Sequence, residues 1–522
     1  MALSSVSFVE GQGGLGRPID SKDHYSGLAF YNVSTLPSGF SNTSNATRCK
    51  LLYSVDDAIA AGIKKDYSDA TAAQGVYTFT AVGADGDTVE IKIADFVPTT
   101  GAAQSTSLGV YTKTAADTTV TLLATAYKNL INAGTNTHGY SATSSVGAVT
   151  IIAPKSMGAG LNGATALSAT IVGTIAGTIT SQIGTSVAGV ASKFAQYYYQ
   201  ISEFFRMQPK GFLWVGFFGT PSTYTELTDM QVNAGTNGAS IRQLAVWKDG
   251  TWASADITYL QAIGTACKAL YQPLSFVYGA NLVATTDITT AVDVSTLSAN
   301  LVSSCISQCA SGLGNFIYKT SGGATKISIP NIGTMLGAIA LRKVSESIAY
   351  VGKTNLSNGT ENELIAFCNG QLYTSFSANQ LTALDTKGHV FMLKYPSYTG
   401  SFFNSSRTCI TTTSDYATIE LNRTICKAER NLYAKMVPYL SSPIGFNSNG
   451  TIQDTFIAMF ENEAISGLDQ MVKDSELSQR QVVINPTQNT LSTSTLTISV
   501  TLVPYGVARF IVINIGFKTS IS

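Results

Sequence analysis

Three glycines near the start of the chain have the G-x-G-x-x-G spacing with which dinucleotide-binding folds hold a pyrophosphate. They are Gly11, Gly13 and Gly16, and they follow a stretch over residues 3–9 with the character of a strand. A dinucleotide site also needs a helix directly after the glycines, whose N-terminal N–H groups face the phosphates. Residues 17–23 (RPIDSKD) contain a proline and lack the apolar spacing of a helix. We therefore interpret the glycine-rich stretch as the hinge of an extended arm.

Two further motifs suggest chemistry but have simpler explanations. Residues 351–354 (VGKT) resemble the end of a phosphate-binding loop, but Ser347 stands where the first glycine is required, and the intervening residues are apolar and stiff. Asp85 and Asp87 have the spacing of calcium ligands, but no carboxylate follows at the distance that an EF-hand loop needs. A hairpin turn at Asp85-Gly86 explains these aspartates better.

Histidine and cysteine are the other side chains that could support catalysis or metal binding. The three histidines, His24, His138 and His389, lie far apart in the sequence. The seven cysteines are scattered and include no C-x-x-C pair; Cys305 and Cys309 have the spacing of one helix face, but no histidine lies nearby to complete a zinc site. No G-x-S-x-G or H-E-x-x-H motif occurs. We expect no catalytic residues, no metal site, no cofactor and no enzymatic activity.

The composition favours a protein that assembles. Only 12% of the 522 residues are charged, and the 32 basic and 32 acidic residues balance, whereas soluble domains have about 25% charged residues. A surface so poor in charge associates readily and is natural in a subunit that copies of itself cover. There is no basic cluster for nucleic acid, no apolar run long enough to span a membrane, and no signal-like N-terminus. We expect a chain that is made in the bacterial cytoplasm, without nucleic-acid binding or direct membrane insertion.

Changes in sequence character divide the chain into five parts. Residues from about 73 to 192 are rich in Thr, Ala, Gly and Ser with short alternating strands and one helix near 118–131, whereas apolar strands alternate with helices from 193 onward. The predicted class is an α+β or α/β multidomain protein. Its predicted parts are an N-terminal extended arm (1–25), the first part of an α/β core (26–72), an inserted β-rich surface domain (73–192), the rest of the core (193–410) and a C-terminal domain (411–522).

Within the core, the hydrophobic spacing predicts individual elements. Strands are expected at residues 27–33, 212–218, 244–247 and 274–278, and helices at 194–207, 255–271 and 297–310. The last hundred residues predict helices at 419–437 and 451–472, followed by two strands that form a terminal hairpin. The apolar side chains that alternate along these two strands are Leu496, Ile498, Val500 and Leu502, then Ile511, Ile513, Ile515 and Phe517. Because an isolated hairpin is at best marginally stable in water, these strands need partners.

Several motifs of the C-terminal half resemble those of contractile tail sheath proteins. They are Asp415-Tyr416 with Ile419-Glu420-Leu421-Asn422-Arg423, Lys427-Ala428-Glu429-Arg430, Leu440-Ser441-Ser442-Pro443-Ile444, Ile484-Asn485-Pro486-Thr487-Gln488-Asn489, and Val503-Pro504-Tyr505-Gly506-Val507-Ala508-Arg509. Ser345-Glu346-Ser347-Ile348 is similar to a core segment of the same family. The resemblance covers residues 200–522 and the N-terminal arm. The β-rich insertion is similar only to the outward-facing insertions that vary most between sheaths.

The resemblance implies a structural subunit of a phage tail or a phage-like injection particle. Such subunits polymerise as stacked rings and a helical homo-oligomer around an inner tail tube, between baseplate and terminator or cap proteins, and contract to drive the tube through a target envelope. The resemblance also implies that subunits exchange strands. The residues expected to do so are Leu3, Val6 and Phe8 of the N-terminal arm, hinged at Gly11, Gly13, Gly14 and Gly16, and the eight apolar residues of the two C-terminal strands. The second C-terminal helix is expected to face the tube, and our hypothesis for the contact is Asp454, Glu461, Glu463 and Asp469.

Two other classes of protein remain open. A β-rich surface-layer or fibre-type adhesin is suggested by the Thr/Ala/Gly/Ser-rich insertion, but it predicts a secretion signal or repeats, which we do not find. An enzyme on the α/β core predicts a convergent set of titratable groups. Deleting residues 1–12 separates the enzyme from the sheath, because an enzyme should tolerate the deletion and a sheath should not.

Overall fold

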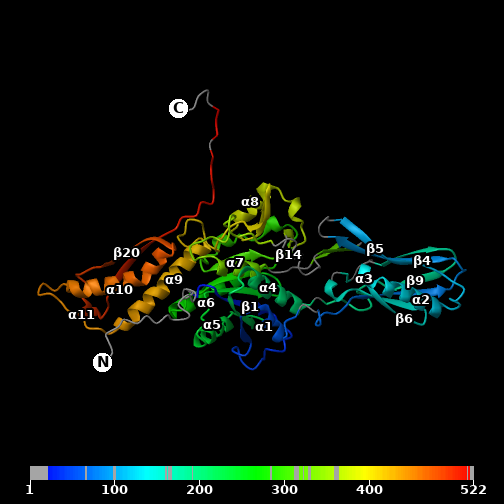
Figure 1. Ribbon diagram of the computed structural model, residues 1–522, viewed down its shortest axis with the longest axis horizontal. Helices are drawn as coiled ribbons and strands as arrows, with labels where there is room; N and C mark the ends of the chain where they lie inside the picture. The colour runs from blue at the N-terminus through cyan, green and yellow to red at the C-terminus, as the bar shows by residue number, and fades with distance from the viewer. Residues whose placement is uncertain are drawn as a thin grey trace, which may run out of the picture.

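The computed structural model of the chain is elongated, with a β-rich region at one end, an α/β body in the middle and a helical region at the other end (Figure 1). The structure describes residues 22–64, 67–97, 102–158, 161–162, 167–190, 192–282, 285–310, 317–320, 323–326, 331–357, 364–513 and 515–517. The mixed α/β class predicted from the sequence is confirmed by the sheets and helices of these residues.

A six-stranded sheet forms the centre of the body, in the order β13-β12-β11-β1-β10-β2. Its strands are β1 (Tyr25–Tyr31), β2 (Cys49–Leu52), β10 (Phe212–Phe217), β11 (Gln243–Lys248), β12 (Ser275–Ala280) and β13 (Val302–Ile306). All neighbouring pairs are parallel except β2, which lies antiparallel to β10 at the edge. The central strand β1 pairs Leu28 with Val215 on one side and with Ala245 on the other. These strands are almost continuously apolar because helices cover both faces of the sheet.

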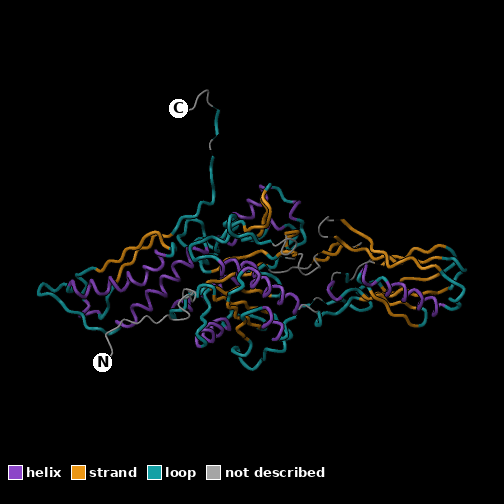
Figure 2. The backbone as a smooth tube through the Cα atoms, in the orientation of Figure 1, coloured by secondary structure: helices purple, strands orange, loops and turns teal. Residues whose placement is uncertain are grey.

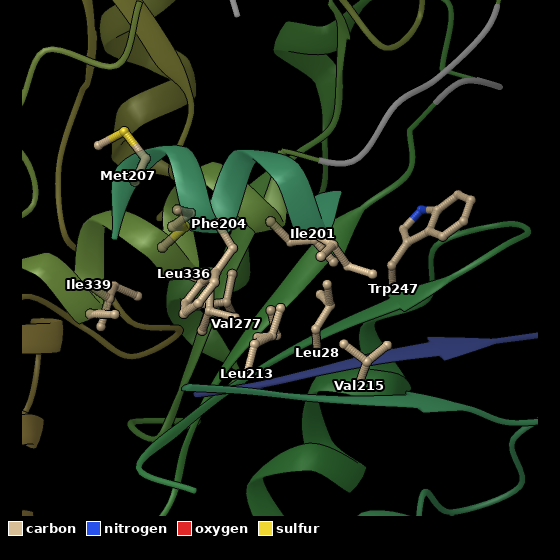
Figure 3. Packing of buried hydrophobic residues seen from close by; sticks show 14 of the residues in the cluster. Leu28, Ile201, Phe204, Met207, Leu213, Val215, Trp247, Val277, Leu336 and Ile339 are labelled. Atoms are coloured by element: carbon tan, nitrogen blue, oxygen red, sulfur yellow. The ribbon is translucent and has the colours of Figure 1, made fainter. Parts of the chain in front are cut away.

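The helices of the body form two layers. They are α1 (Val55–Ala60), α4 (Lys193–Met207), α5 (Glu226–Thr236), α6 (Ser254–Ala269) and α7 (Ile332–Leu341). On one face, Ile201 and Phe204 of α4 and Leu336 of α7 pack on sheet residues such as Leu28 and Val215 (Figure 3). On the other face, α5 and α6 cover the sheet. The close crossing of α4 and α7 requires Gly333, because a Cβ atom there would lie 2.1 Å from the Gln200 carbonyl oxygen.

Shorter elements lie around the body, and one of them, the strand at residues 317–320, contacts the β-rich region. They are β14 (Gln308–Ala310), β15 (Ile317–Thr320), β16 (Gly323–Lys326), β17 (Leu364–Phe367), β18 (Met392–Tyr395), β19 (Tyr398–Phe403) and α8 (Ala378–Thr386). β14 pairs with β17, β15 with β16, and β18 with β19. The helix predicted over residues 297–310 is wrong, because this segment contains strands β13 and β14. All five residues of β13 are buried, so the strand shows no polar alternation that would separate it from a buried helix.

The β-rich region consists of two sheets that share one hydrophobic core. One sheet has the order β6-β7-β3-β9 and the other β5-β4-β8. The elements are β3 (Gln74–Ala81), β4 (Thr88–Val97), β5 (Ala102–Thr112), α2 (Val120–Ala133), α3 (Thr135–His138), β6 (Ser141–Ser145), β7 (Ala148–Ile152), β8 (Leu167–Val172) and β9 (Ala176–Ser181). Helix α2 is tied to this core by the Tyr127 hydroxyl, which accepts the Ile91 N–H at 2.7 Å. The hairpin predicted at Asp85-Gly86 is wrong, because β3 and β4 belong to different sheets and this turn connects them.

The two chain segments that join the β-rich region to the body run side by side. Thr71 and Val190 form an antiparallel bridge. Below it, Asp69 caps the start of α4: its carboxylate accepts hydrogen bonds from the Ser192 hydroxyl at 2.6 Å and from the Lys193 and Phe194 N–H groups at 2.8 and 3.0 Å. One side chain from the outgoing segment therefore fixes the returning one, as a helix N-cap does.

The C-terminal region forms the other end of the molecule. It contains α9 (Ile419–Met436), α10 (Asp454–Lys473), β20 (Leu477–Ile484), α11 (Thr490–Thr493) and β21 (Ile498–Pro504). The two long helices lie side by side, and β20 runs along α10 (Figures 1 and 2). A small core between helices and strands includes Ala428, Leu468, Met471, Leu477 and Val482.

Candidate assembly surface

The motifs that suggested phosphate or metal chemistry do not form a site among the described residues. Lys353 of the VGKT stretch binds the Glu346 carboxylate at 2.6 Å and lies over the Tyr350 ring. Asp87 accepts N–H groups of Ala84, Thr174 and Ile175, so it organises a turn. No group of three or more His, Cys, Asp or Glu side chains that could hold a metal ion occurs in the part of the chain that the structure describes. The glycines Gly11, Gly13, Gly14 and Gly16 lie outside the described residues.

The three histidines lie in different parts of the molecule. His24 precedes β1 and packs edge-on against Phe212, and His138 ends α3 in the β-rich region. His389 is completely buried, with Nδ1 3.0 Å from the Ser304 hydroxyl and Nε2 2.9 Å from the Val292 carbonyl oxygen. Burial lowers the pKa of His389 to about 4. Since Ser304 is buried as completely, this pair supports packing and is closed to a substrate.

The cysteines whose surroundings are described are free and buried. Burial raises the pKa of the Cys426 thiol to about 11 and that of the Cys49 thiol to about 12. A thiol with such a high pKa is a poor nucleophile and metal ligand at neutral pH. No helix among the described residues has the length and apolar character needed to cross a membrane.

The C-terminal sheet has one apolar face, and that face is covered. β20 and β21 pair antiparallel, from Ile484 opposite Ile498 to Leu477 opposite Pro504. Ile498, Val500 and Leu502 pack toward the core beneath, whereas Ser499 and Thr501 point to solvent. The strand predicted from these alternating residues is therefore confirmed for Ile498, Val500 and Leu502; Leu496 precedes it.

The partner of this strand differs from the prediction. The expected hairpin joined residues 496–502 to residues 511–517, but β21 pairs with β20 instead. The sheet has only two strands, so one edge of β20 and one edge of β21 carry no strand partner among the described residues. Open edges of this kind accept a strand from another chain, since their N–H and C=O groups are already aligned.

The C-terminal tail, defined here by its described residues 510–513 and 515–517, leaves the body as an extended segment (Figure 1). Its apolar side chains are almost fully exposed, from 74% for Ile513 to 106% for Phe517. Ile511, Ile513, Ile515 and Phe517 share one side of the alternation, and Phe510 and Val512 share the other. A contiguous apolar surface of this kind marks an interaction site in a soluble protein.

An ion pair fixes the point from which the tail leaves. The Arg509 guanidinium donates to both carboxylate oxygens of Asp385, at 2.7 and 2.6 Å. Asp385 lies near the end of α8 and also accepts a hydrogen bond from the Asn404 side chain. Both hydrogen bonds come from Nη2 of Arg509, and this ion pair orients the chain before the tail begins.

The acidic residues proposed to contact the tube are mostly engaged within the subunit. Glu461 accepts the Ile484 N–H of β20 at 2.9 Å, Asp469 pairs with Arg480, and Glu463 lies 3.9 Å from Lys435 of α9. Asp454, at the start of α10, is exposed. The outward side of α10 carries small and uncharged residues, including Ala458, Asn462 and Ser466. A role of these four acids at a tube surface stays a prediction.

A buried ionic cluster joins the root of the N-terminal arm to the C-terminal region. Lys427 of α9 donates to Asp23 at 2.6 Å and to Glu476 at 2.7 Å, and Arg430 donates to Asp23 at 3.2 Å. Burial raises the pKa of the Glu476 carboxyl. The predicted exchange residues Leu3, Val6 and Phe8 lie outside the described residues, but the chain that carries them enters the fold at this cluster.

The sequence did not reveal the ion pairs that anchor the N-terminal arm and the C-terminal tail. Asp385 gives no signal in the sequence, because its partner Arg509 is 124 residues away. Arg509 is the last residue of the Val503–Arg509 stretch. A charged residue directly before an apolar run was the one signal in the sequence for an anchor at this position. Phe510 and Val512 were also missed, because they lie off the alternation that defined the predicted strand.

The described fold defines a mixed α/β protein whose C-terminal sheet and tail are open to partners. The chain belongs to the DUF2586 family. The model of the DUF2586 N-terminal domain matches residues 100–407, and that of the DUF2586 C-terminal domain matches residues 415–522.

No curated protein matches the chain. Among solved structures, a chain of the cryo-EM structure of the anti-feeding prophage baseplate, 6-fold symmetrised, is 14% identical, with a TM-score of 0.43 over 62% of this chain and 80% of that chain. A chain of the same baseplate in its contracted state is 13% identical, with a TM-score of 0.37 over 62% of this chain and 84% of that chain.

Proposed function

We propose that this protein is the structural subunit of a contractile tail sheath, without enzymatic activity. Copies of the chain polymerise as stacked rings around an inner tube and contract to drive that tube through a target cell envelope. The observation that carries the proposal is the exposed apolar tail at residues 510–517, combined with a two-stranded sheet whose edges are open. The sequence motifs shared with sheath proteins support the same function.

The tail and the open sheet have complementary properties. A strand added at the edge of the β20–β21 sheet continues its hydrogen bonding and places alternate side chains on its two faces. The Ile511, Ile513, Ile515 and Phe517 side would join the apolar face, next to Ile498 and Val500, while the opposite side would meet solvent. We propose that the tail of one subunit occupies this edge in a second copy of the chain.

The N-terminal arm is proposed to supply another strand to the same assembly. Leu3, Val6 and Phe8 would make the contacts, and Gly11 to Gly16 would give the arm its reach. Because the arm enters the fold at Asp23, which Lys427 holds, a pull on the arm is transmitted to α9. Joints made of shared strands can turn while the subunits stay connected, and contraction requires this property.

The remaining surfaces would bind the other components of the particle. We propose that α10 faces the inner tube, with the exposed Asp454 as the acidic residue most available for the contact. Baseplate and terminator proteins would cap the two ends of the polymer. The charged content of 12% agrees with a chain whose surface is largely covered after assembly.

Negative-stain electron microscopy of the full-length protein, alone and coexpressed with its tube protein, tests the proposal. We expect striated hollow cylinders from the full chain, and their loss after deletion of residues 1–12 or 510–522. The substitution Val512→Asp is the matched control, because its side chain is expected to face solvent in the joined sheet. Monomers that persist with the tube protein present would overturn the proposal and favour the adhesin interpretation.

A further inference from the structure

A small cavity lies where α9 crosses the amino ends of β1, β11 and β12. Its volume is about 10 Å³, which is space for one water-sized group. Three arginines line it: Arg242, directly before β11, and Arg423 and Arg430 on α9. Asp23, Ser275 and Cys426 also line the cavity.

Positive charge exceeds negative charge around this cavity. Both carboxylates of the adjoining cluster already bind cations: Asp23 pairs with Lys427 and Arg430, and Glu476 pairs with Lys427. Glu420, one turn before Arg423, directs its carboxylate toward the Ser406 hydroxyl at 3.0 Å. Arg242 and Arg423 form no direct ion pair among the described residues, and the nearby Asp23 carboxylate, which attracts both arginines, is shared with Lys427 and Arg430.

Two N–H groups at the cavity are buried without a hydrogen-bond partner among the described residues. They are Nε of Arg242 and Nη2 of Arg423. Arg423 is only 4% exposed, and its other terminal nitrogen donates to the Arg342 and Lys343 carbonyl oxygens at 3.2 Å, which fixes the guanidinium plane. Burial and the nearby Arg430 lower the pKa of Arg242 to about 10. Buried charged donors are normally paired, and these two donors are available to bind a negatively charged group.

We propose that this cavity binds one small anion of the size of chloride. The anion would accept hydrogen bonds from Arg242 and Arg423 and reduce the repulsion between the three guanidinium groups. It would thereby hold α9 on the amino edge of the central sheet. This role concerns the single folded subunit and is independent of the proposed sheath function.

Thermal unfolding of the full chain tests the site, with sodium chloride exchanged for sodium gluconate at constant ionic strength. Gluconate is too large for the cavity. We expect a saturable rise of the unfolding temperature with chloride, of roughly 1–2 °C for a chain of this length at tenfold excess over the dissociation constant. Arg242→Gln should lose this rise. Arg480→Gln is the matched control, because Arg480 pairs with Asp469 away from the cavity.

A second measurement locates the ion directly. Bromide replaces chloride, and its anomalous scattering from crystals should give a peak between Arg242 and Arg423. The proposal is overturned if chloride and gluconate give the same unfolding temperature, or if Arg242→Gln keeps the chloride-dependent rise. Arg423→Gln is a weaker test, since it also removes the hydrogen bonds to the end of α7.

Discussion

Replacement of Ile513 by aspartate in the C-terminal tail should weaken assembly without affecting the subunit itself. Ile513 is 74% exposed in the single chain. Substitutions at such positions usually change the free energy of unfolding by less than about 0.5 kcal/mol. In the proposed sheet between subunits, however, Ile513 would lie on the side of the tail that becomes buried.

The size of the effect follows from that burial. Moving an isoleucine side chain from water into an apolar contact contributes roughly 1.5–3 kcal/mol. In the proposed assembly each subunit lends one tail, so Ile513→Asp would remove this contribution once per subunit added to the polymer. A factor of ten in an equilibrium constant corresponds to about 1.4 kcal/mol. The critical concentration for assembly should therefore rise roughly 10- to 100-fold, before any added cost of burying the carboxylate.

Sedimentation of polymer over a range of protein concentrations measures the critical concentration. Val512→Asp is the control, because Val512 is as exposed in the single chain but lies on the opposite side of the tail. We expect Val512→Asp to assemble at nearly the wild-type concentration and both variants to unfold at the wild-type temperature. Equal effects of Ile513→Asp and Val512→Asp would refute the alternation on which the reasoning depends.

Three further predictions concern single side chains. Arg509→Gln should let chymotrypsin cleave at Phe510 up to about fivefold faster, because a partly exposed ion pair contributes at most about 1 kcal/mol; an unchanged rate would show that Asp385 does not anchor the tail. Asp69→Ala should lower the free energy of unfolding by about 1–2 kcal/mol in urea denaturation, and Asp69→Asn by less, since asparagine also caps helices. His389 has its pKa lowered from 6.5 to about 4, so the unfolded chain takes up its proton first as the pH falls. The free energy of unfolding should thus decrease by up to about 1.4 kcal/mol per pH unit from pH 6.5 toward pH 4, and His389→Gln should lack this decrease.

The long elements of the fold could be predicted from hydrophobic spacing. The helix expected at 194–207 is α4, that at 419–437 is α9, and that at 451–472 is α10 within three residues at each end. The strands at 212–218, 244–247 and 274–278 also agree with β10, β11 and β12. The helices have a clear period, and the strands are short, continuously apolar runs between turn residues, so local sequence determines both.

Pairing between strands was harder to predict, because it depends on residues distant in the sequence. β20 was not expected, since a register shift between Leu477 and Gln479 interrupts its alternation and hides its apolar face. The ionic anchors Asp23–Lys427 and Asp385–Arg509 join residues 404 and 124 positions apart, and neither partner is distinctive alone. Of the residues predicted to make strand contacts between subunits, Ile498, Val500 and Leu502 pack on the core of their own subunit, and the tail residues are exposed. The contacts between subunits remain predictions.

The paired segments at Thr71 and Val190 have a practical consequence. The chain leaves and re-enters the body at adjacent points, where the Ser192 hydroxyl donates to the Asp69 carboxylate at 2.6 Å. The two ends of the β-rich region are therefore already close together. A region with adjacent ends can be replaced by a short turn. It can also be exchanged for a foreign domain whose termini lie close together. In both cases the entropic cost of loop closure is small. Asp69 lies outside the replaced region, so its hydrogen bonds to the start of α4 would be kept in such a variant. If the proposed assembly forms, chosen payloads could be displayed along it at this junction while the central sheet and the C-terminal region keep their native sequence.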